Sequence, residues 1–276
     1  MSSNSDVTDH YQHGDLLERI AALLDEDGFD PAHPTHESLT PYEHFHGRGV
    51  EATDELAGAL SVSAEDHILD VGSGIGGPAR YLARRFGCRV TGIDLTPEFC
   101  AVARTLTRAL GLDDRVRIEQ GDALAMPFSD ESFDGAYSMN VSMNIADKAG
   151  LYRELHRVLR QGAWLALSEL SLGPAGEPDY PTPWARTRAS SFLATLSETL
   201  EGLESSGFEI VQSRDTTEET LDFGARSKAM VDRGEKPPHR AVMLIHGDLA
   251  AEVMSNVSKG VKQGQLVPIE VLCRKS

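Results

Sequence analysis

The stretch of sequence that decides the fold is Asp66-His-Ile-Leu-Asp-Val-Gly-Ser-Gly-Ile-Gly-Gly-Pro78. Residues 67–71 are a short apolar run with β-branched side chains, which predicts a buried strand. Glycines then recur with the spacing of a nucleotide-binding turn, at Gly72, Gly74 and Gly77. A helical pattern starts at Pro78, and proline is well tolerated in the first turn of a helix. A strand, a glycine turn and a helix together bring a ligand against bare backbone and the positive end of a helix.

Asp70 lies just before these glycines and narrows the choice of ligand. A carboxylate at this place would repel the pyrophosphate of a dinucleotide, but not the ammonium and sulfonium groups of S-adenosylmethionine (SAM). The glycine spacing alone does not separate the two ligands, so the preference for SAM over NAD rests on Asp70. In the alternative interpretation, Asp70 only ties down the loop by accepting hydrogen bonds from backbone amides, which is compatible with SAM.

Composition and charge exclude several classes of protein. The chain has 276 residues, of which 40% are apolar, enough for one large α/β domain or two small ones. Its net charge of −17 argues against a general binder of nucleic acids or membrane surfaces, which needs a basic face. Three widely separated cysteines, Cys88, Cys100 and Cys273, suit reduced thiols better than a disulfide framework. Neither a membrane-spanning run nor the pattern of a signal peptide is found, so we expect a cytoplasmic protein.

Strands and helices alternate from residue 62 onward. The predicted strands span 67–71, 90–94, 115–119, 133–139, 163–170, 208–213 and 266–273. Helical patterns span 15–27, 50–60, 78–86, 97–111, 147–162, 192–206, 217–232 and 240–258. This alternation predicts an α/β fold that is doubly wound and Rossmann-like, with a mostly parallel seven-stranded sheet.

We expect one domain over residues 1–276, because no repeat or long linker divides the chain. It would comprise an N-terminal helical cap over 1–61, whose first 13 residues are polar and frayed, and a SAM-binding core over 62–170. A lid-like insertion over 171–190 follows the fifth strand, and residues 191–276 complete the sheet and helices. The insertion holds four prolines, and a long irregular segment after the carboxyl end of a strand is a candidate lid. The alternative is a surface excursion without a role.

Two further acids follow predicted strands. Asp94 ends the second strand, 20 residues after Gly74, a spacing that suits contact with ribose hydroxyls. Asp122, in Gly121-Asp-Ala123, follows the third strand. At this place a carboxylate can accept a hydrogen bond from the exocyclic amine of adenine. The alternative for both is an ordinary aspartate in a turn.

Together these stretches resemble the class I SAM-dependent methyltransferases. The matching elements occur in the expected order over about residues 45–170, namely Leu-Asp-Val-Gly-Ser-Gly-Ile-Gly-Gly (69–77), Gly-Ile-Asp (92–94), Gly-Asp-Ala (121–123), Pro-Phe-Ser-Asp-Glu-Ser-Phe-Asp (127–134) and 152–162. The resemblance implies SAM as cofactor, with S-adenosylhomocysteine as product. It implies that the glycine loop holds the methionine part of SAM. The predicted cofactor-binding residues are Asp70, Gly72, Ser73, Gly74, Gly77, Asp94, Leu95, Asp122, Ala123 and Met139.

A looser resemblance points to the small-molecule branch that contains the sarcosine/dimethylglycine, phosphoethanolamine and tocopherol methyltransferases. It rests on Phe45-His46 ahead of a helix and on the tail 208–216 followed by two helices and a strand. The chain departs from this branch at Gln161-Gly-Ala163, where most relatives read Pro-Gly-Gly, which should alter only a turn. It also has Met139-Asn140 where the enzymes of glycine derivatives tend to carry Gln-Asp. The missing carboxylate argues against an amino-acid amine as acceptor.

Methyl transfer from a sulfonium is an in-line displacement, in which a protein mainly aligns and desolvates the nucleophile. A base is needed only when the acceptor keeps a proton. The catalytic candidates are His44, His46 and Asn140, with a histidine as the best base. In the alternative interpretation, the two histidines are surface groups. No metal is expected, because no third ligand has a suggestive spacing.

Ligands of open α/β sheets bind beyond the carboxyl ends of the strands, which places residues 139–144 beside the transferring methyl. An aromatic wall and an anchor for an acidic substrate could come from the insertion. The predicted substrate residues are Tyr42, Met143, Asn144, Tyr180, Trp184 and Arg186. The alternatives are a capped turn after the fourth strand and hydrophobic packing for Trp184.

The sequence therefore predicts an enzyme that transfers a methyl group from SAM to a small-molecule acceptor at nitrogen, oxygen or sulfur. Nucleic acid and membrane are not expected as partners, and a homodimer is left open. Three alternatives remain: an NAD-linked oxidoreductase on a similar fold, a non-catalytic SAM-binding protein and a nucleic-acid methyltransferase. The last is disfavoured by the net charge of −17.

Overall fold

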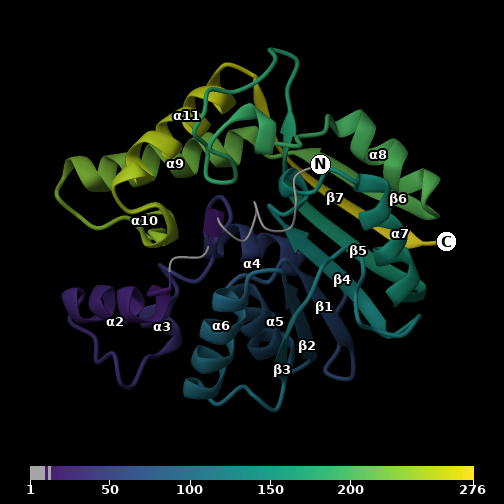
Figure 1. Cartoon of the computed structure of the whole chain (residues 1–276), viewed down its shortest axis with the longest axis horizontal. Helices are drawn as coiled ribbons and strands as arrows, with labels where there is room; N and C mark the ends of the chain where they lie inside the picture. The colour runs from purple at the N-terminus through teal and green to yellow at the C-terminus, as the bar shows by residue number, and fades with distance from the viewer. Residues whose placement is uncertain (1–9, 12–13) are drawn as a thin grey trace.

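A single mixed sheet is the centre of the computed structural model, which describes residues 10–11 and 14–276; most of the N-terminal segment expected to be frayed lies outside the described residues. Within them, seven strands pair in the order β3-β2-β1-β4-β5-β7-β6 (Figure 1). Only β7 runs antiparallel to its neighbours, β5 and β6. The predicted doubly wound, mostly parallel sheet is confirmed. The strands are β1 (His67–Val71), β2 (Arg89–Asp94), β3 (Val116–Gln120), β4 (Phe133–Met139), β5 (Leu159–Leu172), β6 (Phe208–Asp215) and β7 (Leu266–Lys275).

Helices cover both faces of this sheet (Figure 1). They are α2 (Leu16–Glu26), α3 (His36–Leu39), α4 (Val50–Gly58), α5 (Gly77–Phe86), α6 (Pro97–Ala109), α7 (Lys148–Val158), α8 (Leu196–Ser205), α9 (Thr217–Asp232), α10 (Ala241–His246) and α11 (Ala250–Lys262). None of the helices in the described part of the chain has the length and apolar character needed to cross a lipid bilayer.

The central strand β1 is apolar on both faces because helices pack on each side of it. Leu69 and Val71 belong to a buried cluster with residues of α7 and α8. Ile68, which precedes them and points to the opposite face of the sheet, belongs to a second cluster with residues of α4, α5 and α6. A strand buried on both faces reads as a continuous apolar run, as residues 67–71 do. The parallel strands β1 to β4 then end together at one edge, which positions the loops that follow them.

The N-terminal helices pack against a C-terminal helix beside this edge. Figure 1 shows α10 between α2 and the α9–α11 pair. Leu16, Ile20 and Leu24 of α2 share a buried cluster with Leu244 and Ile245 of α10. The amide of Arg240, just before α10, also donates to the carbonyl of Pro41 at 2.7 Å. Segments about 200 residues apart therefore form one wall.

Several predicted boundaries differ from the structure, including the end of the helix expected over 147–162, which stops at Val158. The helix expected from residue 192 begins at Leu196, because Thr195 and Glu198 form a capping box there. The helix expected over 240–258 is divided into α10 and α11 by Gly247, which has φ 51° and opens a 3-10 turn. Strand β5 starts at Leu159 rather than 163, because Leu159 pairs with Phe133 ahead of a bulge.

The irregular segment between β5 and α8 packs along α11. The side-chain amide of Asn256 donates to the carbonyl of Pro181 at 2.9 Å, and Lys259 forms an ion pair with Asp179. The amide of Gly173 donates to the carbonyl of Gln265 at 2.7 Å. The expected insertion is thus held at both its start and its middle by the C-terminal part of the chain.

Candidate functional site

A cavity of about 320 Å³ lies beyond the carboxyl ends of β1 to β4. We call it the strand-end cavity. Its walls come from the loops that follow these four strands, and Tyr11 and Phe45 contribute from the N-terminal segment. The position agrees with the rule that open α/β sheets bind ligands at the carboxyl ends of their strands.

The glycine loop forms the part of this wall that follows β1. Gly72 has φ 72° and Gly74 has φ 53°, a backbone region that favours glycine. A Cβ atom on Gly72 would lie 2.2 Å from Cγ2 of Val141, so no side chain fits there. The amide of Gly72 donates to the carbonyl of Ile93 at 2.8 Å, which fixes the loop against β2. Bare backbone therefore lines the cavity, as a closely held ligand requires.

Asp94 joins the glycine loop to the end of β2. Its Oδ2 accepts a 2.8 Å hydrogen bond from the amide of Gly74, and its Oδ1 accepts a 2.8 Å hydrogen bond from the amide of Thr96. Burial raises the pKa of this carboxyl, and the two amides oppose the rise. A carboxylate has about four acceptor positions, so Asp94 retains capacity for two ligand hydroxyls at the cavity wall.

Asp122 stands at the end of the next strand and lines the same cavity with Ala123. Its Oδ1 accepts a 2.8 Å hydrogen bond from the amide of Leu124, which holds the turn after β3. Leu95 and Met139 also line the cavity. The structure thus brings together seven of the ten predicted cofactor-binding residues.

The other three predicted residues lie outside the lining of this cavity. Asp70 is buried on β1 below the loop, and burial raises the pKa of its carboxyl to about 7. Ser73 packs on Gly92, where an added Cβ would come within 2.7 Å of the serine hydroxyl. A Cβ on Gly77 would lie 2.1 Å from the carbonyl oxygen of Glu43. The structure therefore places Gly77 against the N-terminal cap, where its lack of a side chain allows a close approach of two backbones.

A second cavity, of about 110 Å³, adjoins the first. We call it the lid cavity. Tyr11, Phe45 and Asn140 line both cavities. The remaining walls come from His46 and Gly47, from Met143, from the end of β5 and the irregular segment, and from C-terminal residues between 239 and 257. Among the described lining residues none is Asp, Glu, Lys or Arg, so the lid cavity is apolar apart from histidines, Asn140, a tyrosine and backbone.

The predicted catalytic residues divide between these cavities and the core. Asn140 has φ 57° and lines both cavities, and its amide donates to the carbonyl of Ser168 at 2.8 Å. His46 lines the lid cavity. His44 is 1% exposed and lies outside both linings, so the structure places it in the core rather than at a ligand.

A chain of hydrogen bonds connects the two histidines. Nδ1 of His44 lies 2.9 Å from Oγ1 of Thr53, which lies 3.0 Å from Nε2 of His46. Nδ1 of His46 in turn lies 3.1 Å from the carbonyl oxygen of Gly47. That carbonyl only accepts, so Nδ1 of His46 carries a hydrogen and Nε2 accepts from Thr53. Burial lowers the pKa of His46 to about 4 and the pKa of His44 well below its usual value, so both rings are neutral at pH 7.

Three of the six predicted substrate residues line neither cavity, and the contacts of two of them, Tyr42 and Tyr180, show what holds them elsewhere. Tyr42 is buried, its hydroxyl donates to Oδ2 of Asp27 at 2.6 Å, and the guanidinium of Arg240 lies over its ring. Tyr180 donates to Oε2 of Glu177 at 3.0 Å. Tyr42 thus contacts both Asp27, which follows α2, and Arg240, which precedes α10.

The four remaining predicted substrate residues are Met143, Asn144, Trp184 and Arg186, and three of them line a cavity. Arg186 is exposed on the irregular segment and lines neither cavity. Trp184 lines the lid cavity, and its indole nitrogen donates to Oγ of Ser191 at 2.9 Å. Met143 lines the lid cavity, whereas Asn144 lines the strand-end cavity. An acidic substrate in the lid cavity would therefore not meet Arg186 in this arrangement.

The sequence analysis did not identify Glu169 and Lys148, the two residues that hold the loop after β4. Glu169, buried at the end of β5, accepts from the amides of Val141 and Ser142 at 3.1 and 3.2 Å. Burial raises the pKa of Glu169 to about 7, while these amides oppose the rise. In the sequence Glu169 is one polar residue within an apolar strand, and nothing local marks its role.

Lys148 connects the same loop to the irregular segment. Its Nζ donates to the carbonyls of Ser142, Ile145 and Phe192 at 2.8, 2.6 and 2.6 Å. The amide of Phe192 donates to the carbonyl of Met143 at 2.8 Å. Burial lowers the pKa of Lys148 to about 8, against the opposing charge of Glu169. The loop that lines both cavities and the end of the insertion therefore form one unit.

Sequence reasoning also missed the C-terminal wall of the lid cavity, which comprises His239, Ala241, Val242, Ile245, His246, Met254 and Val257. An apolar helical stripe in this region is visible in the sequence, but a stripe does not say what it faces. Only the packing of α10 on α2 brings these residues to the ends of β4 and β5.

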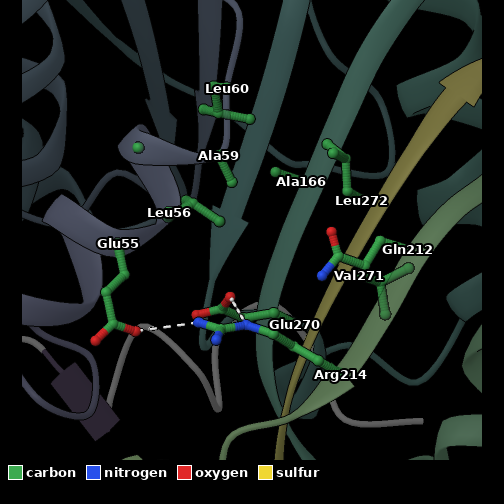
Figure 2. A pocket seen from close by; sticks show the side chains of 11 residues that line it. Glu55, Leu56, Ala59, Leu60, Ala166, Gln212, Arg214, Glu270, Val271 and Leu272 are labelled. Carbon is green, nitrogen blue, oxygen red and sulfur yellow. Dashed lines mark hydrogen bonds and ion pairs between the residues drawn. The ribbon is translucent and has the colours of Figure 1, made fainter.

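A third cavity, of about 380 Å³, lies between α4 and the strands β5, β7 and β6. Figure 2 shows its apolar side chains from α4, such as Leu56, opposite an ion-pair cluster. In that cluster Arg214 pairs with Glu55 at 3.1 Å and with Glu270 at 2.8 Å. Buried Arg48 pairs with the same two acids. These paired charges connect α4 to the paired strands β6 and β7.

Comparison with known proteins identifies the central part of the chain. A family profile described as a methyltransferase domain matches residues 69–167. The methyltransferase GfsG of Streptomyces halstedii is 29% identical over 223 residues, which cover 79% of this chain and 78% of that protein. The glycine/sarcosine/dimethylglycine N-methyltransferase of Actinopolyspora halophila is 35% identical over 121 residues, which cover 44% of this chain and 21% of that protein. Two further relatives are matched over 54% of their length, so the chain spans about half of each.

Solved structures show the same fold. The geranyl diphosphate C-methyltransferase from Streptomyces coelicolor, in complex with S-adenosyl-L-homocysteine, has a TM-score of 0.75 at 17% identity, covering 100% of this chain and 99% of that one. The matched residues 69–167 include the glycine loop, Asp94 and Asp122, which line the strand-end cavity. A dinucleotide-dependent oxidoreductase is thereby set aside. Residues 69–167 thus carry a methyltransferase domain, and the chain is a SAM-dependent methyltransferase.

Proposed function

We propose that the strand-end cavity binds SAM and that the lid cavity binds the methyl acceptor. The carrying observation is that Tyr11, Phe45 and Asn140 line both cavities. Two ligands that fill adjoining cavities meet at these shared residues, where a methyl group passes over a short distance. Bound SAM supplies an activated methyl group, so positioning and exclusion of water are the main tasks of the chain.

The residues of the strand-end cavity fit the chemical groups of SAM. The backbone at Gly72 and Gly74 leaves room for the methionine part, because a side chain on Gly72 would collide with Val141. The carboxylate of Asp94 can accept hydrogen bonds from the two ribose hydroxyls. The carboxylate of Asp122 can accept a hydrogen bond from the exocyclic amine of adenine. The acidic lining also favours a ligand with a net positive charge over a pyrophosphate.

The lid cavity supports an uncharged, mainly apolar acceptor. Its described lining contains no cation to pair with a phosphate or a carboxylate and no carboxylate to pair with an ammonium. Burying an unpaired charge in such surroundings is costly. Geranyl diphosphate and phosphoethanolamine, named for proteins of similar fold, both carry phosphate, which this lining does not match.

We propose that residues 1–276 act as one domain, in which residues 1–61 form the cap and 171–190 the lid. A cytoplasmic location is supported by three cysteines that are buried and unpaired. A small molecule rather than a nucleic acid as the acceptor is supported by the net charge of −17.

Titration calorimetry with SAM and with S-adenosylhomocysteine tests the cofactor site. We expect micromolar dissociation constants for both, and no binding of either would refute the proposal. A screen with methyl-labelled SAM then compares neutral acceptors with phosphates, carboxylic acids and amines of the same size. Transfer confined to the charged compounds would contradict the uncharged acceptor.

A further inference from the structure

We propose that His239 is a catalytic residue, whose imidazole accepts the hydrogen of a hydroxyl group on the acceptor and takes the proton as the oxygen is methylated. The acceptor class is then an uncharged alcohol or phenol. This inference rests on the proposed function and deepens it, because it names the acceptor atom and the residue that faces it.

His239 differs from three other polar residues that line the lid cavity, namely His46, Tyr11 and Asn140. Both ring nitrogens of His46 are engaged, by Thr53 and by the carbonyl of Gly47. Burial raises the pKa of Tyr11, so its hydroxyl stays protonated and is a poor base. The side chain of Asn140 is an amide, which hydrogen-bonds but does not take up a proton. Among the described residues, the buried Nδ1 of His239 has no hydrogen-bond partner.

The backbone holds this imidazole at the cavity wall. His239 follows Pro237 and Pro238, whose rings restrict φ. The next amide, of Arg240, donates to the carbonyl of Pro41. On one side the ring packs on Gly49, where an added Cβ would come within 2.8 Å of Nδ1. A side chain fixed in this way faces a bound acceptor with little loss of conformational entropy.

The ring is neutral at physiological pH. Burial lowers the pKa of His239 to about 3, and His46 adds to the effect. One of its two nitrogens therefore carries an unshared pair that accepts a hydrogen bond from a hydroxyl. The described residues of the lid cavity offer no charged group that would compete for this pair.

A hydroxyl group must lose its proton when its oxygen is methylated, so an acceptor of this class requires a group that takes up the proton. The acceptor oxygen forms its bond to the methyl carbon, and the carbon–sulfur bond breaks with its electron pair remaining on sulfur. The hydroxyl proton passes to the unprotonated nitrogen of His239 and later to solvent. A protonated ether is a far stronger acid than an imidazolium, so even a weakly basic ring takes the proton. A neutral amine, by contrast, becomes an ammonium ion when it is methylated, and the product retains this charge without passing a proton to a partner.

The test uses the full chain, labelled SAM and a matched set of neutral alcohols and phenols, amines, and carboxylic acids. We expect labelled product from hydroxyl compounds. For the best of them, His239→Phe should lower kcat about 100-fold or more, in the range of general-base contributions. The Kd for SAM should change less than threefold. Exposed His33→Phe is the control with full activity, and added imidazole should partly restore His239→Ala.

Binding provides a second readout that does not depend on turnover. Trp184 lines the lid cavity, so its fluorescence reports occupancy, and Trp184→Phe identifies its signal. With S-adenosylhomocysteine present, benzyl alcohol should bind about tenfold more tightly than toluene, and His239→Phe should abolish this preference. An unchanged preference in that variant, failure of both probes to bind at millimolar concentration, or transfer to amines or acids only would overturn the proposal. Failure of the wild type to bind SAM would instead refute the proposed function itself.

Discussion

The amide of Gly74 donates a 2.8 Å hydrogen bond to Oδ2 of Asp94, which ties the glycine loop after β1 to the end of β2. The same carboxylate also holds the amide of Thr96. One side chain thus shapes two of the four loops around the strand-end cavity. Asp94 consequently has two roles in the proposed site, since it orders the loop and accepts the ribose.

Asp94→Ala should weaken SAM binding by roughly tenfold to a hundredfold, because hydrogen bonds to a charged group contribute about 1.5–3 kcal/mol each. Calorimetry with SAM measures the change, and circular dichroism checks the fold. Exposed Asp113→Ala provides the control for loss of an acid near the same sheet. A folded Asp94→Ala protein with wild-type affinity would show that SAM binds elsewhere.

Gly72→Ala should both destabilise the chain and weaken SAM binding. The new Cβ would lie 2.2 Å from Val141 Cγ2, and φ is 72°. Gly111→Ala is a matched control, because φ is 65° there but no atom lies within 4 Å. Urea unfolding should show a loss of about 1 kcal/mol for Gly111→Ala, from backbone strain alone, and a larger loss for Gly72→Ala. Equal losses in the two variants would argue against the collision, whereas partial rescue by Val141→Ala would support it.

Lys148→Met should loosen the insertion while leaving SAM affinity within threefold. The variant loses three hydrogen bonds to the carbonyls of Ser142, Ile145 and Phe192, and Lys148 lines neither cavity. Limited proteolysis should cut within 173–194 at least several-fold faster than in the wild type. Exposed Lys262→Met is the control. An unchanged cleavage rate would mean that the segment is held mainly by its contacts with α11.

Glu169 should make stability depend on pH. Its pKa in the folded chain is about 7, above the usual 4.5, so between these values the folded state binds more protons than the unfolded state. Stability from this group is therefore present below pH 4.5 and is lost as pH rises toward 7. The loss amounts to roughly 3 kcal/mol by the pKa difference. Urea unfolding of wild type and Glu169→Gln at pH 5 and pH 7.5 measures it. A stability difference between the two proteins that stays constant with pH would contradict the raised pKa.

The strand-end cavity could be predicted because its determinants are local in sequence. Residues 67–71 form a strand wherever they are buried on both faces, and the glycines that follow leave the chain one kind of turn. Asp94 and Asp122 were found because a parallel sheet brings the ends of successive strands together. The structure places Gly77 outside the cavity lining, where its small size allows close contact with the backbone of Glu43. Glycine spacing does not distinguish a glycine that lines a cavity from one that allows such a contact.

The lid cavity could not be predicted in the same way. Its walls bring together His46, Asn140, Trp184 and His239, which are separated by up to 193 positions (239 − 46). The predicted substrate residues Tyr42 and Arg186 were near this region in sequence, but hydrogen bonding to Asp27 and exposure to solvent take them elsewhere. Glu169 and Lys148 were missed because their partners are backbone groups of other loops.

The sequence by itself determined the sheet, the glycine loop and the class of cofactor, because alternating apolar patterns and strand-end acids are read over a few neighbouring residues. The tertiary structure alone decided which glycines and histidines line a cavity. It also decided what closes the acceptor side, because α10 packs on α2 through apolar contacts and the Arg240–Pro41 hydrogen bond. Burial then removed the charge of His46 and His239 and, within the described part of the chain, left Nδ1 of His239 without a hydrogen-bond partner. These properties depend on desolvation by distant segments, which no local pattern encodes.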